Sequence, residues 1–442
     1  MPTILKAAAV LDVDNDRVIP DGYVLVDGEK IESWGRRVDL PPLPPDTAVL
    51  SFPQQTLLPG LINCHAHLCV PSGGQPFYLE QSDEMALLTA VRSMRLEQAA
   101  GITTVRDCGD QNGVLFALRQ AVNQGILDGP RLVLCGPPLT MSGGHAHFLG
   151  GVADGPAEIA RTVGRRIADG ADFIKLIGTG GGTPGTQPDQ ASYSRDELAV
   201  AVSEAHRLNV PVSVHCRGIP GIVNAIEAGV DQIEHACFEL PDGTLSFDRK
   251  LAVRMARAGI GVTPTIQLYR DTHAHLQEKA VTGGLNETER PYLKILPGVI
   301  ASKLQALRGF LKAGVNVVAG NDAGLPYTGF GCLWQELEAM MSGGMTAMQA
   351  IAAATGSAAR MLGLEDQIGS IQPGKQADLL IVDGSPIEDI TALSRVRLVM
   401  QAGRTVFTKI EHRTLNAQLR IMISVNIKII GLSGLSSDIL SL

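Results

Sequence analysis

The sequence predicts an α/β protein whose main domain is a (β/α)8 TIM barrel, with a small β-sandwich domain formed from both chain ends. Two features predict this fold. Short apolar runs alternate with helix-like segments through the middle of the chain, and short β-like runs separated by turns occur near both ends. The 442 residues, 45% of them apolar, are enough for one large domain and a smaller one.

The N-terminal part of the sandwich is assigned to residues 1–56. Its β-like runs are separated by Asp-Asn-Asp, Pro-Asp-Gly and Asp-Gly-Glu, which are turn-forming sequences. The runs are residues 10–13, 18–19, 23–26 and 30–34. The proline-rich residues 41–45 then predict a stiff connector.

The barrel is assigned to residues 57–365. Its eight apolar runs are residues 57–63, 102–106, 131–135, 173–177, 210–214, 232–234, 261–264 and 315–319. Helical patterns between them include residues 83–99, 194–208, 221–228 and 247–258. Ser194 and Glu197 form a capping-box signal at the start of one of these helices. Eight strand–helix units favour a closed barrel over an open sheet.

Residues 366–410 are assigned to the C-terminal part of the sandwich, because β character returns after a helix predicted at residues 345–362. The β-like runs there are residues 369–371, 377–382 and 396–401. Residues 411–442 fit neither pattern and are left as an unassigned tail.

Composition excludes several classes of function. The formal net charge of −8 leaves no basic surface for nucleic acid. No uninterrupted apolar stretch reaches the ~20 residues of a membrane span, and the N-terminus lacks a secretory signal. The seven cysteines are dispersed, as is typical of free thiols in a reducing compartment. We therefore expect a cytoplasmic protein that acts on a small-molecule substrate, and the sequence leaves a homo-oligomer open.

Histidines follow the first predicted barrel strand, at the end where catalytic groups of such barrels lie. His65 and His67 are two residues apart, so on a strand they point the same way and can bind one ion. A loop position is the alternative. Further His-x-His pairs occur at residues 145–147 and 273–275, so the pair alone is a weak signal.

Lys175 lies within the apolar run Phe-Ile-Lys-Leu-Ile. A lysine in a buried strand is costly unless it is paired or modified. The alternative is a lysine that reaches solvent from the edge of the sheet. Reaction of the neutral amine with CO₂ gives a carbamate, an anion that can bridge two metal ions.

Three more candidate ligands stand at strand ends. His215 and His235 follow the fifth and sixth runs, and either one alone could be a satisfied core histidine. Asp322 follows the eighth run, where it can bind metal and accept a proton, or serve only as a turn residue. With the three preceding residues they make four histidines, one aspartate and one lysine, a set that suits Zn²⁺ or a similar divalent ion.

These motifs resemble the amidohydrolase superfamily, in its binuclear branch with a carboxylated lysine. Residues 60–67, Gly-Leu-Ile-Asn-Cys-His-Ala-His, are similar to the strand-one motif of that family, with Asn63 where Asp is more usual. Residues 369–378 and 401–406 resemble its C-terminal β segment, so the likeness spans about residues 10–407. Within the superfamily the chain looks most like the prolidases, the Xaa-Pro and Xaa-Arg dipeptidases.

The resemblance implies two metal ions per chain, with zinc expected. One ion would be bound by His65, His67 and Asp322. The second would be bound by His215 and His235, and a carboxylated Lys175 and a hydroxide would bridge the two.

The resemblance also implies that His145, after a Gly-Gly pair, polarises the scissile carbonyl, and that Asp322 passes a proton to the leaving amine. Arg217 stands where those dipeptidases tend to have Tyr. Either Arg217 or Tyr193 could hold a substrate carboxylate. A loop salt bridge is the alternative for Arg217.

Three functions compete. The first is hydrolysis of an amide or peptide bond, by attack of a metal-bridging hydroxide, in a small substrate with a free carboxylate such as a dipeptide or an N-acyl amino acid. The second is hydrolysis of non-peptide amides, ureas, carbamates or cyclic amides. The third, a non-catalytic relative, is disfavoured because all six predicted ligands are present.

Overall fold

The structure is a computed structural model that describes residues 2–72 and 81–409. The predicted tail at residues 411–442 lies outside the described residues. Residues 1–407 form one compact unit, whose fold is described here. Within the described ranges no helix combines the length and the apolar character needed to cross a membrane.

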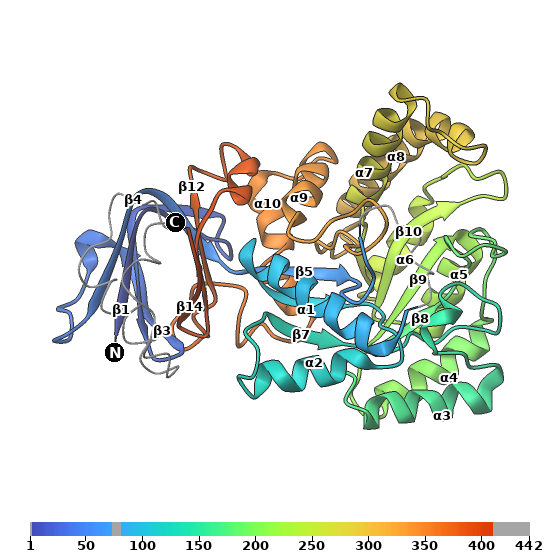
Figure 1. Cartoon of the computed structure of the whole chain (residues 1–442), viewed down its shortest axis with the longest axis horizontal. Coiled ribbons are helices and arrows are strands. Elements are labelled where there is room, and N and C mark those ends of the chain that lie inside the picture. Colours follow the sequence, from blue (N-terminus) through green and yellow to red (C-terminus); the bar gives the residue numbers. More distant parts are fainter. Residues whose placement is uncertain (1, 73–80, 410–442) are drawn as a thin grey trace, which may run out of the picture. The chain divides into compact units, whose positions relative to one another are not determined.

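A seven-stranded sheet combines strands from both ends of the chain (Figure 1). Its strands are β1 (Thr3–Asp12), β2 (Arg17–Asp27), β3 (Lys30–Arg36), β4 (Ala48–Pro59), β12 (Leu379–Asp383), β13 (Val396–Gln401) and β14 (Arg404–Thr408). They lie in the order β14-β13-β12-β4-β1-β2-β3. β4 connects the two ends, because it runs parallel to β1 on one side and antiparallel to β12 on the other.

The predicted sandwich is one curved sheet and not two separate sheets. Backbone hydrogen bonds connect the edge strand β3 with the segment that precedes β12. Ile31 N donates to Lys375 O at 2.9 Å, and Ala377 N donates to Glu29 O at 2.8 Å. The sheet therefore closes around its own buried apolar side chains, among them Leu57 of β4.

The middle of the chain forms two parallel sheets, ordered β11-β10-β9-β8 and β5-β6-β7. Their strands are β5 (Leu61–Ala66), β6 (Ile102–Asp107), β7 (Arg131–Leu134), β8 (Ile174–Ile177), β9 (Val212–Gly218), β10 (Gln232–Glu239) and β11 (Gly261–Thr263). Five of them, β5, β6, β8, β10 and β11, are buried at every residue. Such continuous burial is typical of parallel strands that are covered on both faces.

Helices lie around these parallel strands (Figure 1). The first six are α1 (Asp83–Ala99), α2 (Val114–Asn123), α3 (Gly155–Ala168), α4 (Arg195–His206), α5 (Ile219–Ala228) and α6 (Arg249–Arg257). The others are α7 (Gln267–Val281), α8 (Glu289–Ala313), α9 (Leu333–Ser342), α10 (Ala347–Ala353) and α11 (Gly356–Met361). The alternation of strand and helix is the one that the sequence predicts.

The eighth predicted strand, residues 315–319, does not form a regular strand. Parallel bridges replace it: Val317 pairs with Val262 of β11, and Ala323 pairs with Ala66 of β5. A further bridge, between Leu139 and Leu176, links the chain after β7 to β8. The described residues thus contain two parallel sheets joined by single bridges, and no continuous eight-stranded sheet.

Local signals in the sequence vary in how well they locate helices. The predicted helix at residues 83–99 matches α1, and Ser194 caps α4 through the predicted capping box with Glu197. The helix predicted at residues 345–362 is instead two helices, α10 and α11. The break is at Thr355, whose backbone is not helical (φ −141°, ψ −99°).

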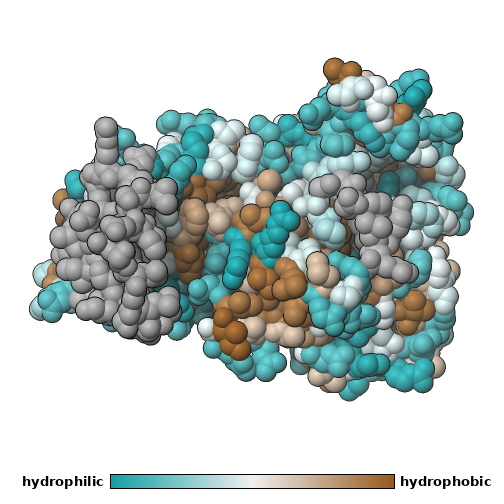
Figure 2. All heavy atoms as spheres, viewed as in Figure 1, coloured by the Kyte–Doolittle hydropathy of each residue, from teal (hydrophilic) through white to brown (hydrophobic). Residues whose placement is uncertain are grey.

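The face drawn in Figure 2 is largely hydrophilic, with hydrophobic residues gathered near its middle, where Figure 1 draws α1 and α2. Met85, Leu88 and Leu96 of α1 are among the large apolar side chains that remain exposed. Most of the other large apolar side chains of α1 and α2 contribute to the main hydrophobic core.

An ion pair that can be tested connects the seven-stranded sheet with the parallel strand β7. Arg131 Nη1 lies 2.9 Å from Asp378 Oδ2, and the Asp378 side chain is 3% exposed. In Arg131→Met the buried carboxylate loses its cation, which costs about 2–3 kcal/mol. Thermal unfolding followed by circular dichroism should show a Tm lower by about 3 °C.

Arg404→Met is the matched control. Arg404 also joins the seven-stranded sheet to the barrel region, through Asp128 at 3.5 Å, but both side chains are more than 70% exposed. An exposed pair contributes about 0.5 kcal/mol or less. Equal Tm shifts in the two variants would contradict a special role for the Arg131–Asp378 pair.

Candidate metal centre

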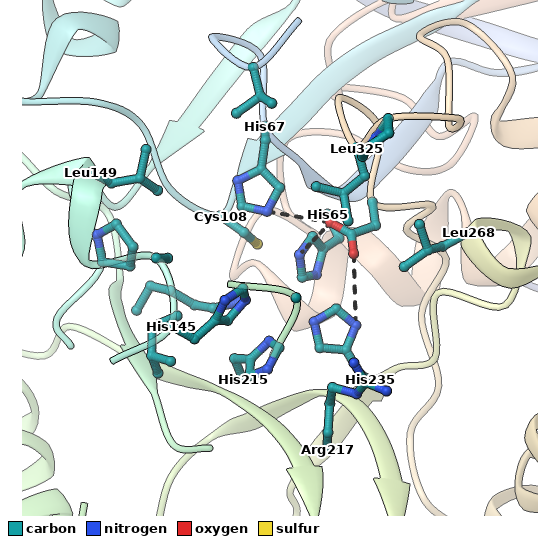
Figure 3. Close-up of a pocket in the computed structure, with 18 of the residues that line it drawn as sticks. His65, His67, Cys108, His145, Leu149, His215, Arg217, His235, Leu268 and Leu325 are labelled. Carbon is teal, nitrogen blue, oxygen red and sulfur yellow. Dashed lines mark ion pairs between the residues drawn. The ribbon is translucent and has the colours of Figure 1, made fainter. Parts of the chain in front are cut away.

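A cavity of about 260 Å³ lies at the carboxyl ends of the parallel strands (Figure 3). Eight of the nine predicted site residues line it: His65, His67, His145, Lys175, His215, Arg217, His235 and Asp322. They come from four different strands, β5, β8, β9 and β10, and from three loops, which hold His67, His145 and Asp322. Tertiary folding therefore brings together side chains that are up to 257 positions apart in the sequence, between His65 and Asp322.

His65, His67 and Asp322 form a group of potential ligands whose ligand atoms all lie within 4.8 Å of one another. Oδ1 of Asp322 lies 3.3 Å from Nε2 of His65 and 3.4 Å from Nε2 of His67. Two ligands that share a tetrahedral ion at about 2.0–2.1 Å are themselves separated by roughly 3.4 Å. The Asp322 oxygen is thus spaced from each of the two nitrogens as two ligands of one ion would be.

The hydrogen bonds of these residues leave the right atoms for a metal. His65 Nδ1 donates to Glu234 Oε2 at 2.7 Å, and His67 Nδ1 donates to Gly109 O at 3.0 Å. In its neutral form each imidazole would then keep the lone pair of Nε2 for a metal. Oδ1 of Asp322 is buried, and no hydrogen bond of ordinary geometry reaches it from the described residues. Burial opposes ionisation, but the nearby histidines hold the pKa of Asp322 well below its usual range.

His215 and His235 form a second group beside the first. Their ring centroids are 4.6 Å apart, and His235 lies 5.0 Å from His65. Nε2 of His215 donates to Gly180 O at 3.2 Å, and Nδ1 of His235 is 2.8 Å from the Thr265 hydroxyl. Burial lowers the pKa of both imidazoles well below its ordinary value, so they are neutral, which is the form that binds metal.

Lys175 is 2% exposed and lies on β8 within the cavity wall. Over residues 2–72 and 81–409 its ammonium group makes no hydrogen bond or ion pair. The alternative, a lysine that reaches solvent from the edge of the sheet, is therefore wrong, and the structure contains a buried amine with no hydrogen-bond or ion-pair partner among the described residues. Such a group is unfavourable unless a ligand or a chemical change compensates it.

The hydrogen bonds of His145 define which of its nitrogens carries hydrogen. Ala146 N donates to the Thr183 hydroxyl at 3.1 Å, so that hydroxyl donates in turn to His145 Nδ1 at 2.8 Å. Nε2 of His145 then carries the hydrogen. Burial, assisted by Arg217, lowers the pKa of His145 to about 3, so it is a neutral hydrogen-bond donor at the cavity.

Arg217 lines the cavity, but it already has a partner. Nη2 of Arg217 lies 2.7 Å from Oε2 of Glu239, and the two side chains are 21% and 10% exposed. Glu239 is the last residue of β10 and pairs with Gly218 of β9 after a shift in register. The sequence offered a salt bridge as the alternative for Arg217 but did not identify Glu239 as the partner, because the register shift cannot be read from the apolar pattern of the strand.

Tyr193 is the one predicted site residue that the structure places elsewhere. It is 2% exposed, it does not line the cavity, and its hydroxyl donates to Ala153 O at 2.8 Å. Its backbone carbonyl accepts from Asn224. Tyr193 therefore fixes a loop against the core, and the prediction that it binds substrate is withdrawn.

Comparison with known proteins identifies the family. The model of the amidohydrolase family matches residues 56–406, most of the chain. The chain belongs to the amidohydrolase family. Amidohydrolases are hydrolases, and this chain is accordingly an enzyme that hydrolyses C–N bonds.

Three amidohydrolases illustrate the similarity. Ochratoxinase of Aspergillus niger is 28% identical over 432 residues, which is 90% of this chain and 84% of that protein. The crystal structure of a Xaa-Pro dipeptidase with bound methionine in the active site has a TM-score of 0.82 at 30% identity and covers 92% of this chain and 100% of its own. A prolidase complexed with N-methylphosphonate-L-proline has a TM-score of 0.78 at 26% identity, with coverage of 92% and 100%.

Several residues around this amidohydrolase site were not singled out from the sequence. Arg106 and Glu234 are charged residues inside buried strands, and that was the available signal. Gly181 had no signal at all. A Cβ atom on Gly181 would lie 2.5 Å from Cδ2 of His145, so only glycine leaves room for that ring.

Gly181→Ala should therefore displace His145 and lower kcat by about 10-fold or more, since a lost donor to a developing oxyanion typically costs ~10²–10³. Its metal content should stay at the wild-type value, because none of the six predicted ligands moves. Elemental analysis and steady-state kinetics measure the two quantities. Gly164→Ala, on α3 with open space around its Cα, is the control and should change neither. Wild-type kcat in Gly181→Ala would show that the position of His145 does not matter.

Proposed function

We propose that this amidohydrolase cleaves the amide or peptide bond of a small substrate whose leaving group bears a free carboxylate, such as a dipeptide or an N-acyl amino acid. The observation that carries the proposal is the convergence of His65, His67 and Asp322 at ligand spacing beside a second pair of histidines. The two parallel sheets and their bridges would act together as one (β/α)8 barrel that holds this site.

The residues fit two divalent ions, for which we propose zinc. His65, His67 and Asp322 would hold one, and His215 and His235 the other. A carbamate formed from CO₂ and the amine of Lys175 would bridge them, which would turn a buried amine without a partner into a coordinated anion. When bound, such ions supply a strongly acidified water and polarise a carbonyl oxygen.

The protein's own residues would handle the proton and the developing charge. Asp322 is ionised and buried at the base of the cavity, so its carboxylate would accept a proton from the attacking water and deliver it to the leaving amine. His145 presents a neutral Nε2–H toward the cavity, where it would donate to the carbonyl oxygen as that oxygen becomes negative. Asp322 and His145 would both perform these roles from their present positions.

The position of Arg217 supports the proposal of a substrate with a carboxylate, because it brings a guanidinium to the wall of an otherwise largely apolar cavity. In the related crystal structures the bound compounds are methionine, an amino acid, and N-methylphosphonate-L-proline, an amino-acid derivative. Glu239 would hold one edge of the guanidinium and leave the remaining donors for the substrate.

The same ion pair favours a second candidate, the hydrolysis of non-peptide amides, ureas, carbamates or cyclic amides. With Glu239 at 2.7 Å, Arg217 contributes no net positive charge to the cavity. The walls also carry apolar side chains such as Phe148, Leu268 and Leu325. A neutral substrate would suit that environment equally well, and the metal site would be unchanged.

Metal content tests the two-ion site. Purified wild-type protein, supplied with zinc, should contain about two ions per chain by elemental analysis. Lys175→Ala should lose the bridging group, and with it at least one ion and nearly all activity. Short carboxylic acids should restore part of that activity by taking the place of the carbamate. Lys250→Ala, an exposed lysine on α6, is the control. An unchanged rate in Lys175→Ala would exclude the bridging role.

Arg217→Met tests the choice of substrate. A charge-assisted hydrogen bond to a carboxylate contributes ~1.5–3 kcal/mol, so kcat/KM for a carboxylate substrate should fall by roughly ten- to a hundredfold. The C-terminally amidated analogue should be hardly affected and serves as the internal control. If the wild type instead prefers neutral amides, ureas or carbamates, the second candidate is the better account.

A further inference from the structure

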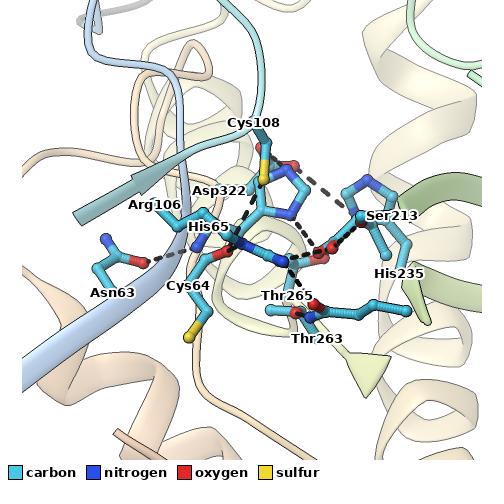
Figure 4. A network of polar contacts seen from close by, with 12 residues as sticks. Asn63, Cys64, His65, Arg106, Cys108, Ser213, His235, Thr263, Thr265 and Asp322 are labelled. Carbon is cyan, nitrogen blue, oxygen red and sulfur yellow. Dashed lines mark hydrogen bonds and ion pairs between the residues drawn. The ribbon is translucent and has the colours of Figure 1, made fainter. Parts of the chain in front are cut away.

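Glu234 is a fully buried carboxylate that the proposed reaction does not use. It lies on β10, directly before His235, and is 0% exposed. Its carboxylate accepts a hydrogen bond from His65 Nδ1 at 2.7 Å and one from Ser213 Oγ at 2.5 Å. Figure 4 shows His65, Arg106 and Ser213 directed toward the same point from three different strands. Glu234 is thus the centre of a hydrogen-bond network. Among the proposed metal ligands, only His65 is hydrogen-bonded to it within the described residues.

Arg106 balances the charge of Glu234. Its Nη2 lies 2.6 Å from Glu234 Oε1, and its side chain is 3% exposed. Arg106 Nε also donates to Cys64 O at 2.7 Å, and Nη1 donates to the side chain of Gln232. Gln232 in turn donates to Thr263 at 2.6 Å. A buried ion pair with this many hydrogen bonds costs desolvation energy, so its presence beneath a metal site calls for a role.

The other proposed histidine ligands are supported by neutral groups. His67 donates to a backbone carbonyl, that of Gly109, and His215 donates to the carbonyl of Gly180. His235 Nδ1 is hydrogen-bonded to the hydroxyl of Thr265. Within the described part of the chain, His65 is the only one of these four histidines whose Nδ1, on the side away from the cavity, is hydrogen-bonded to a carboxylate.

We propose that the Glu234–Arg106 pair is a positioning device for His65, and that it makes the ion held by His65, His67 and Asp322 the more tightly bound of the two. This inference rests on the two-ion site of the proposed function. A carboxylate that accepts the Nδ1 hydrogen fixes the ring so that Nε2 faces Asp322, and it raises the basicity of that nitrogen. A carbonyl or hydroxyl partner raises the basicity of the ring less, because it carries no full charge.

The role assigned to Arg106 is indirect. It keeps Glu234 charged in a fully buried site, and it fixes the carboxylate so that Oε1 and Oε2 face different partners. Ser213 holds the same oxygen that Arg106 contacts. The other oxygen, Oε2, is thereby left to accept the hydrogen of His65 Nδ1. The network therefore positions this one ligand.

The test is a zinc titration of the metal-free protein against a competing chelator, with Glu234→Gln as the main variant. The wild type should bind zinc in two resolved steps. Glu234→Gln keeps the shape and an acceptor but removes the charge, so the tighter step should weaken by about 10- to 100-fold. The weaker step should change by less than about threefold, a selectivity that a general loss of structure would not produce.

Thr265→Val is the matched control at the second site. It removes the hydroxyl beside His235 without changing the volume much, so it should weaken only the weaker step. The Tm of the metal-free proteins should be compared as well, since it reports the stability of the network separately from zinc binding. If Glu234→Gln does not fold, Ser213→Ala removes one donor to Glu234 and should give a smaller loss with the same selectivity.

The results separate this inference from the proposed function. Equal weakening of both steps in Glu234→Gln, or a loss of the tighter step in Thr265→Val, would overturn the role of Glu234. If the wild type binds only one zinc ion, and Glu234→Gln binds that ion more weakly, the role of Glu234 stands and the two-ion function is overturned. A wild type that takes up no zinc would overturn both.

Discussion

The structure of the site depends on one shared carboxylate, that of Asp322. Its two oxygens lie 3.3–4.0 Å from nitrogens of His65, His67 and His235, which come from β5, from the loop after it and from β10. Without a compensating ion or proton, three imidazoles and an acid at this spacing in a buried cavity would be hard to maintain. The surrounding fold must therefore hold these groups in place at a cost.

Part of that cost is visible in the backbone. Asp322 adopts φ = 61°, and His235, Ala236 and Phe238 at the end of β10 adopt φ values of 67°, 42° and 56°. Each such non-glycine conformation costs roughly 1–3 kcal/mol and persists only where the surroundings enforce it. Lys303 of α8 helps to enforce it, because its buried ammonium donates to the carbonyl of His235 at 2.7 Å. The same distortion returns Glu239 to a position beside Arg217.

Sequence patterns could predict which residues stand at the ends of strands, because an apolar run and the residue that follows it are both visible in one short segment. His65, His215, His235 and Asp322 were found in that way, and Lys175 from its charge within an apolar run. The patterns could not predict the helical pair α7 and α8 or the strand β4. The Gln-Gln pair at residues 54–55 and Pro53 interrupt the apolar alternation of β4, and only its two partners β1 and β12 make it a strand.

The sequence by itself determined the α/β class of the fold, most of its alternation of strands and helices, and which side chains are available as metal ligands. These follow from local periodicity and residue type, which a single segment carries. The tertiary structure alone decided that Tyr193 faces the core, that Arg217 is paired with Glu239, and that Glu234 supports His65. These contacts join residues from different strands or from strand and loop, and they depend on register and backbone distortion. Neither property is encoded in a short stretch of sequence, because each arises only when the strands pack against one another.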